Sequence, residues 1–196
     1  MIKSLIFSAP SGSGKTTIVK HVLNKYPNVK FSVSATTRSQ RANEVDGRDY
    51  HFISVDTFKE YIERDMFLEW EEVYPNQFYG TLWDDVHEIW NNGEMVAFDV
   101  DVAGGAHLVN ILGDEALSFF IKVPLDILQQ RLYDRGTETV ESLKMRIDKA
   151  EHEMEYEKYF DEVIINTHLD ESLKLVEDKV HPVVVNNFCF PPKITQ

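Results

Sequence analysis

The chain has 196 residues, of which 43% are hydrophobic and 27% charged, a composition that predicts a single globular domain. Lysine and arginine number 20 against 33 aspartates and glutamates, so the net charge of −13 argues against nucleic acid or an anionic membrane as partner. One cysteine excludes an intrachain disulfide and a cysteine-based zinc site. No apolar run reaches the roughly 20 residues that span a bilayer, and the first residues do not resemble a signal peptide, so we expect a cytoplasmic location.

The N-terminal half begins with a strand, a glycine-rich loop and a helix, which is the opening of an α/β unit. The mostly apolar residues 2–8 predict the strand, and apolar residues at helical spacing predict a helix over 16–26. Short strands are expected next over residues 30–34, 50–53, 67–74 and 78–82. Helices are expected over residues 55–64, with Ser54 as N-cap, and over 83–91.

The C-terminal half alternates apolar strands with helices. Strands are expected over residues 95–100, 117–123 and 163–165, and helices over residues 125–133, 140–159 and 170–185. This alternation predicts a three-layer α/β/α fold with a central parallel sheet. The short strands of residues 34–82 interrupt the alternation and predict an inserted lobe. We expect one domain over residues 1–187, with a core formed by 1–33 and 83–187, and a loosely held tail over 188–196.

Residues 9–16, A-P-S-G-S-G-K-T, match the phosphate-binding pattern G-x-x-x-x-G-K-[ST], except that Ala9 replaces the first glycine. They lie between the first strand and the first helix, as the motif requires, which argues against a tight turn that binds nothing. Glycines let backbone N–H groups point at phosphate oxygens, and the helix N-terminus favours anions. We expect Lys15 to contact the β- and γ-phosphates and the Thr16 hydroxyl to bind Mg²⁺. The predicted nucleotide-binding residues are Ala9, Pro10, Ser11, Gly12, Ser13, Gly14, Lys15, Thr16 and Thr17.

Residues 36–50, T-T-R-S-Q-R-A-N-E-V-D-G-R-D-Y, resemble the signature T-T-R-x-P-R-x-G-E-x-x-G-x-x-Y of guanylate kinases. Gln40 and Asn43 replace the usual proline and glycine, and Ala103 replaces a usual glutamine. Further similar segments are F-Y-G-T at 78–81, F-D-V-D at 98–101 and R-G-T-E-T at 135–139.

The resemblance covers nearly the whole chain and implies a fold of the P-loop nucleoside-monophosphate kinase type. It implies that the inserted lobe of residues 34–82 binds GMP and that a short lid lies at about 134–142. It also implies an enzyme that phosphorylates GMP with Mg·ATP, so ATP and GMP are the expected small-molecule partners.

The resemblance implies that Arg38 and Arg41 hold the GMP phosphate, with hydroxyl groups donated by Tyr50 and Tyr79. Guanidinium groups match phosphate oxygens in geometry and charge. The residues alone would favour solvated loop charges, because surface arginines are common.

Guanine recognition is assigned by the resemblance to Glu69, because the sequence pattern alone does not separate Glu69 from Glu71 and Glu72. A carboxylate accepts hydrogen bonds from the N1–H and 2-amino groups of guanine, whereas adenine has an acceptor at N1. Mismatched buried polar groups of this kind discriminate by roughly 10⁴-fold. Ser34 and Thr81 are expected to complete the base site with hydroxyl contacts.

Asp99 ends the apolar strand of residues 95–100, and the resemblance implies that it orients Mg²⁺-bound water or GMP-side ligands. Asp101 lies on the same face if the strand continues, and we expect it to bind substrate as well. Asn166, just after the last core strand, resembles the family residue beside the adenine of ATP.

Phosphoryl transfer spreads negative charge over the transferred group. The resemblance assigns Arg135 and Arg146 to meet that charge, together with Lys15 and Arg41. Arg131 is expected to contact ATP, although an i,i+4 pair with a nearby acid is an alternative. A general base is not required, because the attacking phosphate oxygen is already ionised near neutral pH.

The sequence leaves three other functions open. An adenylate- or thymidylate-type kinase leaves residues 38–50 unexplained. A protein-binding module of the guanylate-kinase type need not keep Lys15, Thr16, Arg135 and Arg146 together. A nucleotide-hydrolysing switch requires a water-positioning residue that the sequence does not identify. The sequence does not indicate an oligomeric state.

Overall fold

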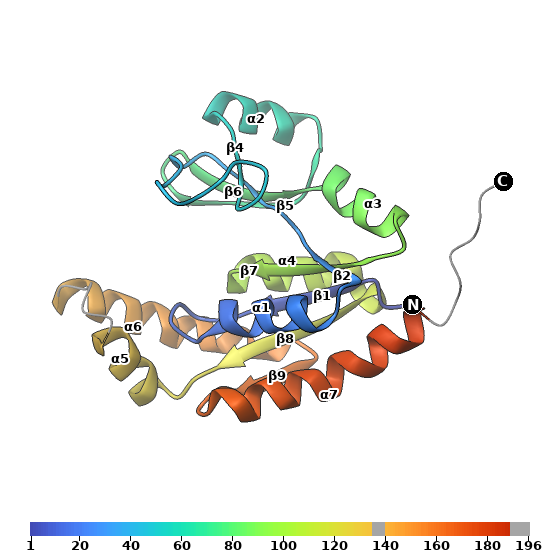
Figure 1. The fold of residues 1–196 in the computed structure, drawn as a ribbon. Coiled ribbons are helices and arrows are strands. Elements are labelled where there is room, and N and C mark those ends of the chain that lie inside the picture. The colour runs from blue at the N-terminus through green and yellow to red at the C-terminus, as the bar shows by residue number, and fades with distance from the viewer. Residues whose placement is uncertain (135–139, 189–196) are drawn as a thin grey trace.

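The computed structural model describes residues 1–134 and 140–188, and Figure 1 shows two sheets of different size. The larger sheet has five parallel strands in the order β2-β7-β1-β8-β9. Its strands are β1 (Ser4–Ser8), β2 (Val29–Phe31), β7 (Met95–Val100), β8 (Ala116–Lys122) and β9 (Glu162–Ile165). Because β1 pairs with both β7 and β8, the loop that follows β1 begins at the centre of the sheet.

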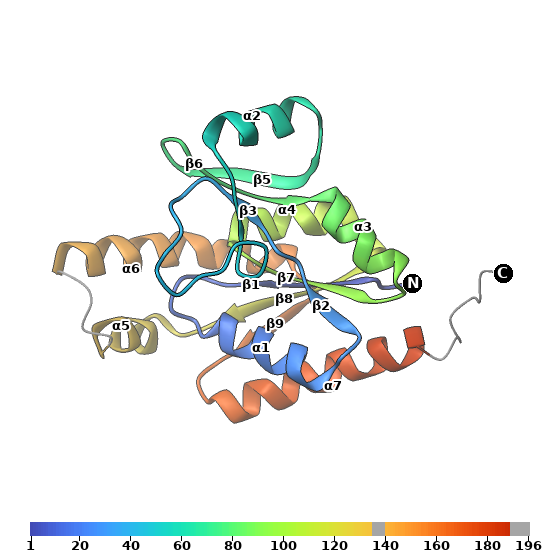
Figure 2. The same cartoon turned by 45° about the horizontal axis from the view of Figure 1, so that its top comes forward.

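Helices cover both faces of the larger sheet, as the alternating pattern predicted (Figures 1 and 2). Successive side chains of a strand point to opposite faces, and β1 shows this clearly. Leu5 and Phe7 pack in the cluster that includes α1 and α7, whereas Ile6 packs in the cluster that includes α3 and α4. The bounds are α1 (Lys15–Lys25), α3 (Trp83–Asn91), α4 (Val102–Leu112) and α7 (Leu169–Phe188). The expected α/β/α fold is confirmed.

Two further helices lie beyond the C-terminal end of β8. Helices α5 (Leu125–Asp134) and α6 (Val140–Met154) pack through Leu128, Leu132 and Ala150. The lid expected at about 134–142 falls between them, and its residues 135–139 lie outside the described part of the chain. The helix expected over 140–159 is divided into α6 and the 3₁₀ helix η2 (Glu155–Tyr159); a second 3₁₀ helix, η1 (Gly113–Glu115), follows α4.

The smaller sheet is formed within residues 35–82 and has the order β4-β3-β6-β5. Its elements are β3 (Ala35–Thr36), β4 (His51–Phe52), α2 (Val55–Glu63), β5 (Phe67–Tyr74) and β6 (Gln77–Leu82). Ser54 caps α2 as expected, since its hydroxyl accepts a hydrogen bond from Thr57 N at 3.0 Å. Phe58 of α2 stacks on Phe67 and Phe78, which gives this sheet a core of its own. The role of these residues as a separate GMP-binding lobe stays a prediction.

Helix α4 has no counterpart among the elements expected from the sequence. Gly104 and Gly105 weaken its helical signal, since each glycine costs about 1 kcal/mol relative to alanine. Asp101 caps the helix by accepting a hydrogen bond from Gly104 N at 2.8 Å, and Leu108 and Leu112 are buried against the sheet. Tertiary packing therefore outweighs local propensity here.

Smaller differences lie at the element ends. Strand β2 ends at Phe31 rather than at residue 34, and the two-residue strand β3 was not expected. Helix α7 continues through Pro182 to Phe188, and most of the expected tail, residues 189–196, lies outside the described residues. Across residues 1–134 and 140–188, the structure contains no helix with the length and apolar character needed to cross a membrane.

Candidate active site

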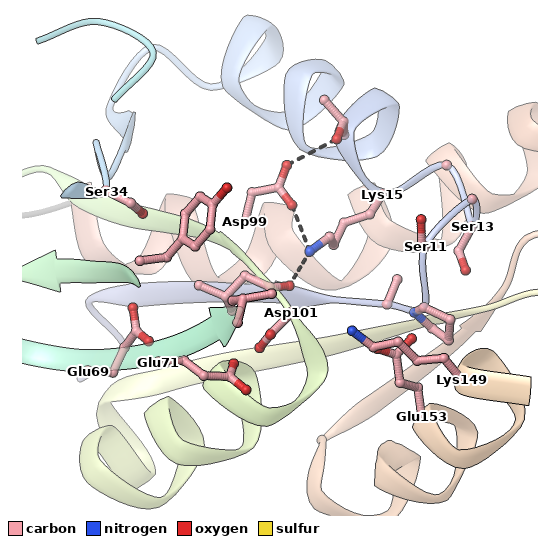
Figure 3. Close-up of a pocket in the computed structure, with 18 of the residues that line it drawn as sticks. Ser11, Ser13, Lys15, Ser34, Glu69, Glu71, Asp99, Asp101, Lys149 and Glu153 are labelled. Atoms are coloured by element: carbon pink, nitrogen blue, oxygen red, sulfur yellow. Dashed lines mark hydrogen bonds and ion pairs between the residues drawn. The ribbon is translucent and has the colours of Figure 1, made fainter. Parts of the chain in front are cut away.

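A cavity of about 570 Å³ lies at the C-terminal ends of β1 and β7 and is closed on its far side by β5 and β6 of the smaller sheet (Figure 3). Ligands of open α/β sheets bind at this edge, outside the carboxyl ends of the strands. All nine residues predicted in the phosphate loop line it, from Ala9 to Thr17, whereas Arg131 and Asn166 do not. The other predicted site residues that line it are Ser34, Tyr50, Glu69, Tyr79, Asp99 and Asp101.

The phosphate loop runs from the end of β1 to the start of α1. Gly12 and Gly14 have φ angles of +94° and +86°, a left-handed conformation that strongly favours glycine. Gly14 is the N-cap of α1 and makes no side-chain cap hydrogen bond, so the first N–H groups of the helix are available to an anion. Among the described residues only Asp65 and Asn76 combine a side chain with positive φ, so Ala9 does not need the freedom of a glycine.

Lys15 and Asp99 point toward each other beside this loop (Figure 3), and Thr16 contacts the same carboxylate. The Lys15 ammonium lies 2.9 Å from Asp99 Oδ1 and also donates to the carbonyl oxygen of Val100. The Thr16 hydroxyl donates to Asp99 Oδ2 at 3.2 Å. One cation, one hydroxyl and one carboxylate are thus held together by α1 and the end of β7.

Glu69 lies on β5, at the opposite side of the cavity from the phosphate loop (Figure 3). Its side chain is buried, and the Thr81 hydroxyl, directly across the β5–β6 ladder, donates to Oε1 at 2.7 Å. Burial raises the pKa of Glu69 to about 7, although the hydrogen bond from Thr81 opposes the shift. Thr81 therefore holds Oε1, and Oε2 faces Gly104 of α4.

The structure separates the three acids that the sequence pattern left together. Glu72 points away from the cavity and accepts a hydrogen bond from Asn76 N at 2.8 Å in the β5–β6 turn. Glu71 lines the cavity with Glu69, because residues two apart on a strand share a face. A hydrogen bond with Asp101 and burial together raise the pKa of Glu71 to about 7.

Arg38 does not line the cavity but lies beside it, in the loop before β4. Its guanidinium group forms a two-pronged ion pair with Glu44, at 2.7 and 2.6 Å, and stacks 4.9 Å from the Tyr50 ring. This pair holds the pKa of Glu44 down at about 2. Arg41 is exposed, and its backbone N–H donates to the same carboxylate at 2.9 Å. The Tyr50 and Tyr79 rings are in edge contact at 5.9 Å.

Three predicted ATP-side residues contact the phosphate loop or its neighbours. The Asn166 amide donates to Ser13 O at 2.7 Å, and Arg131 donates to the carbonyl oxygen of Asn166 at 2.9 Å. Arg131 is thereby joined to the loop after β9, and its contact with ATP stays a prediction. Arg146 reaches Ser11 Oγ at 3.4 Å. Arg135 lies outside the described residues.

Several lining or supporting residues were not identified from the sequence. Glu71, Lys149 and Glu153 line the cavity, and Glu44 holds Arg38. The spacing contained a signal for two of them, since Lys149 and Glu153 follow Arg146 by three and seven residues, on one face of α6. Glu44 could not be found this way, because a loop has no period.

Comparison with known proteins agrees with this geometry. The family model of guanylate kinase matches residues 1–182. The chain is 46% identical over 181 residues to a guanylate kinase of Bacteroides fragilis, covering 90% of this chain and 89% of that protein. It is 47% identical over 171 residues to a guanylate kinase of Salinibacter ruber, with coverage of 87% and 90%. A crystal structure of guanylate kinase from Anaplasma phagocytophilum shares the fold, with a TM-score of 0.72 at 23% identity and coverage of 93% and 86%. The chain belongs to the guanylate kinase family.

Proposed function

We propose that this protein transfers the γ-phosphoryl group of Mg·ATP to GMP, giving ADP and GDP. The observation that carries this proposal is a single cavity with a phosphate loop on one side and the buried carboxylate of Glu69 on the other. The guanylate kinases of Bacteroides fragilis and Salinibacter ruber, similar over about 90% of their length, support the same activity.

Guanine is read by Glu69. Because Thr81 already donates to Oε1, the carboxylate is fixed in orientation, and its remaining acceptor positions take the N1–H and 2-amino groups. Adenine presents an acceptor lone pair at N1, which a buried carboxylate repels. Ser34, on the cavity wall, adds a hydroxyl contact. These roles favour GMP over AMP by mismatch rather than by size.

The GMP phosphate is held by Arg38 and Arg41, with the Tyr50 and Tyr79 hydroxyls beside them. Glu44 keeps the Arg38 guanidinium in one plane, which limits the rotamer entropy lost when phosphate binds. Asp101, the N-cap residue of α4, binds the nucleoside side of GMP.

The ATP phosphates lie in the loop of residues 9–17, with Lys15 on the β- and γ-phosphates. Magnesium fits the oxygen donors of Thr16 and Asp99, because Mg²⁺ in kinases takes one or two protein oxygens together with substrate phosphates and water. When bound, the metal offsets charge on the phosphates. Asn166 lies beside the adenine.

Catalysis consists of positioning and charge stabilisation. The charge that develops on the transferred group is offset by Lys15, Arg41 and Arg146. Arg135, which lies outside the described residues, has the same proposed role. Arg131 supports the ATP side through its contact with Asn166. We also propose that the enzyme acts in the cytoplasm. Its net charge of −13 supports the further proposal that it binds neither nucleic acid nor an anionic membrane.

The test is ADP release with Mg·ATP and GMP, AMP, UMP, CMP or dTMP, supplied one at a time. Strong turnover with GMP alone is expected. Turnover with another nucleotide would contradict the role of Glu69. Nucleotide binding without any turnover would instead favour a protein-binding module of the same fold.

A further inference from the structure

Gly104 lies in the first turn of α4, between the Asp101 cap and the buried part of the helix. Its N–H donates to Asp101 Oδ1 at 2.8 Å, and its φ angle is not in the left-handed region. An alanine there would favour the helix by about 1 kcal/mol. The local backbone therefore gives no reason for glycine at this position.

The surroundings of Gly104 do give a reason. A Cβ atom at this position would lie 3.2 Å from Glu69 Oε2 and 3.2 Å from Asp101 Oδ1, closer than most Cβ contacts. The next nearest atom, Val100 Cβ, is at 3.8 Å, an ordinary van der Waals distance. A side chain would thus press on two carboxylates of the cavity and on little else.

The neighbouring Gly105 shows what a glycine required by the fold looks like. A Cβ atom at Gly105 would lie 2.9 Å from the Cβ atom of Ser8 and 2.9 Å from the Phe160 ring, both inside the protein core. The two adjacent glycines therefore face different neighbours, one the packed interior and the other the carboxylates of the site.

We propose that Gly104 is a specificity-determining position, because its missing side chain leaves the space from which the Glu69 carboxylate binds guanine. Oε1 of Glu69 is anchored by Thr81, so crowding from Gly104 displaces mainly Oε2, the oxygen left for the base. A Cβ atom at 3.2 Å requires its neighbour to move by a few tenths of an ångström. Misplacement on this scale weakens hydrogen bonds that must fit two donors at once. This inference rests on the proposed function.

The experiment compares Gly104→Ala with Gly105→Ala in the full-length protein. Steady-state KM values for GMP, IMP and ATP, kcat and the melting temperature are measured for both variants. For Gly104→Ala we expect the KM for GMP to rise about tenfold, with kcat and the KM for ATP within about twofold of wild type. The preference for GMP over IMP, which lacks the 2-amino group, should fall. The melting temperature should be unchanged or higher, because alanine favours the helix.

For Gly105→Ala we expect a lower melting temperature, because the new methyl group strikes the core. An unchanged KM for GMP in Gly104→Ala would overturn the inference. So would a fall in melting temperature with parallel rises in the KM for GMP and ATP, since that pattern indicates a role in folding. Lack of GMP turnover by the wild-type enzyme would contradict the proposed function instead. The affinity of each protein for GMP, measured by calorimetry, would then test the role of Gly104 separately. Equal affinity in Gly104→Ala and wild type would contradict that role.

Discussion

The two sides of the cavity present different kinds of binding groups. On the phosphate-loop side, the binding groups are mainly backbone N–H groups, fixed by two glycines with positive φ and by the start of α1. On the side of the smaller sheet, they are charged side chains held by partners, as in Glu69 with Thr81 and Arg38 with Glu44. A backbone site binds any phosphate chain, whereas a side-chain site distinguishes one base from another.

Lys15 is the cation that belongs to the phosphate loop itself, and its removal should give the largest effect. In Lys15→Met we expect kcat to fall at least about 10³-fold, because under the proposed function Lys15 offsets charge that develops on the transferred phosphoryl group. Lys20→Met, an exposed lysine on the same helix, is the matched control and should keep wild-type kinetics. Near-wild-type turnover in Lys15→Met would contradict a catalytic role for the phosphate loop.

Glu69→Gln tests the side of the smaller sheet. The amide keeps an oxygen for Thr81 but turns an N–H₂ donor toward the donors of guanine. We expect the ratio of kcat/KM for GMP to that for AMP to fall about 10²-fold. Glu72→Gln is the matched control, since Glu72 faces the turn rather than the cavity. An unchanged ratio would mean that Glu69 does not read the base.

The difference between the two sides also explains what could be predicted from the sequence. The phosphate loop is a contiguous motif, so residues 9–17 were identified together and all line the cavity. Alternation and helical spacing gave most strands and helices. The acids of β5 differ only in which way they point, and that depends on the pairing of Glu69 with Thr81 across the ladder. Sequence spacing could not assign Glu44 to Arg38, nor reveal that Gly104 lies against Glu69.

A substitution of Glu44 tests whether Arg38, on the side of the smaller sheet, needs a carboxylate partner to bind the GMP phosphate. In Glu44→Gln only one of the two hydrogen bonds to Arg38 can be kept, so the guanidinium plane is less constrained. We expect the KM for GMP to rise about tenfold while the KM for ATP stays unchanged. A lower KM for GMP would mean that Glu44 competes with the phosphate for Arg38.

A smaller effect is expected in the pH dependence of GMP binding, which involves the side of the smaller sheet through Glu69. Burial raises the pKa of Glu69 to about 7, and only the ionised carboxylate accepts from both guanine donors. We therefore expect the KM for GMP to rise several-fold as the pH falls from about 8 to 6. The GMP phosphate also titrates, near pH 6, and the pKa values of Glu71 and Glu153 are raised as well, so Glu69→Gln is the control that keeps these contributions and removes only that of Glu69. Parallel pH profiles in wild type and Glu69→Gln would contradict the prediction.

The same shift predicts an effect of opposite sign on the stability of the nucleotide-free protein. The folded-state pKa of Glu69 lies above its ordinary value of 4.5, so the protonated form favours folding. That contribution is fully present below pH 4.5 and is lost as the pH rises through about 7. The melting temperature of wild type should therefore fall more across this window than that of Glu69→Gln. GMP should reduce the difference, because its N–H donors stabilise the carboxylate that burial disfavours. Equal declines in the two proteins would place the pH response elsewhere, in Glu71 and Glu153, whose pKa values are also raised.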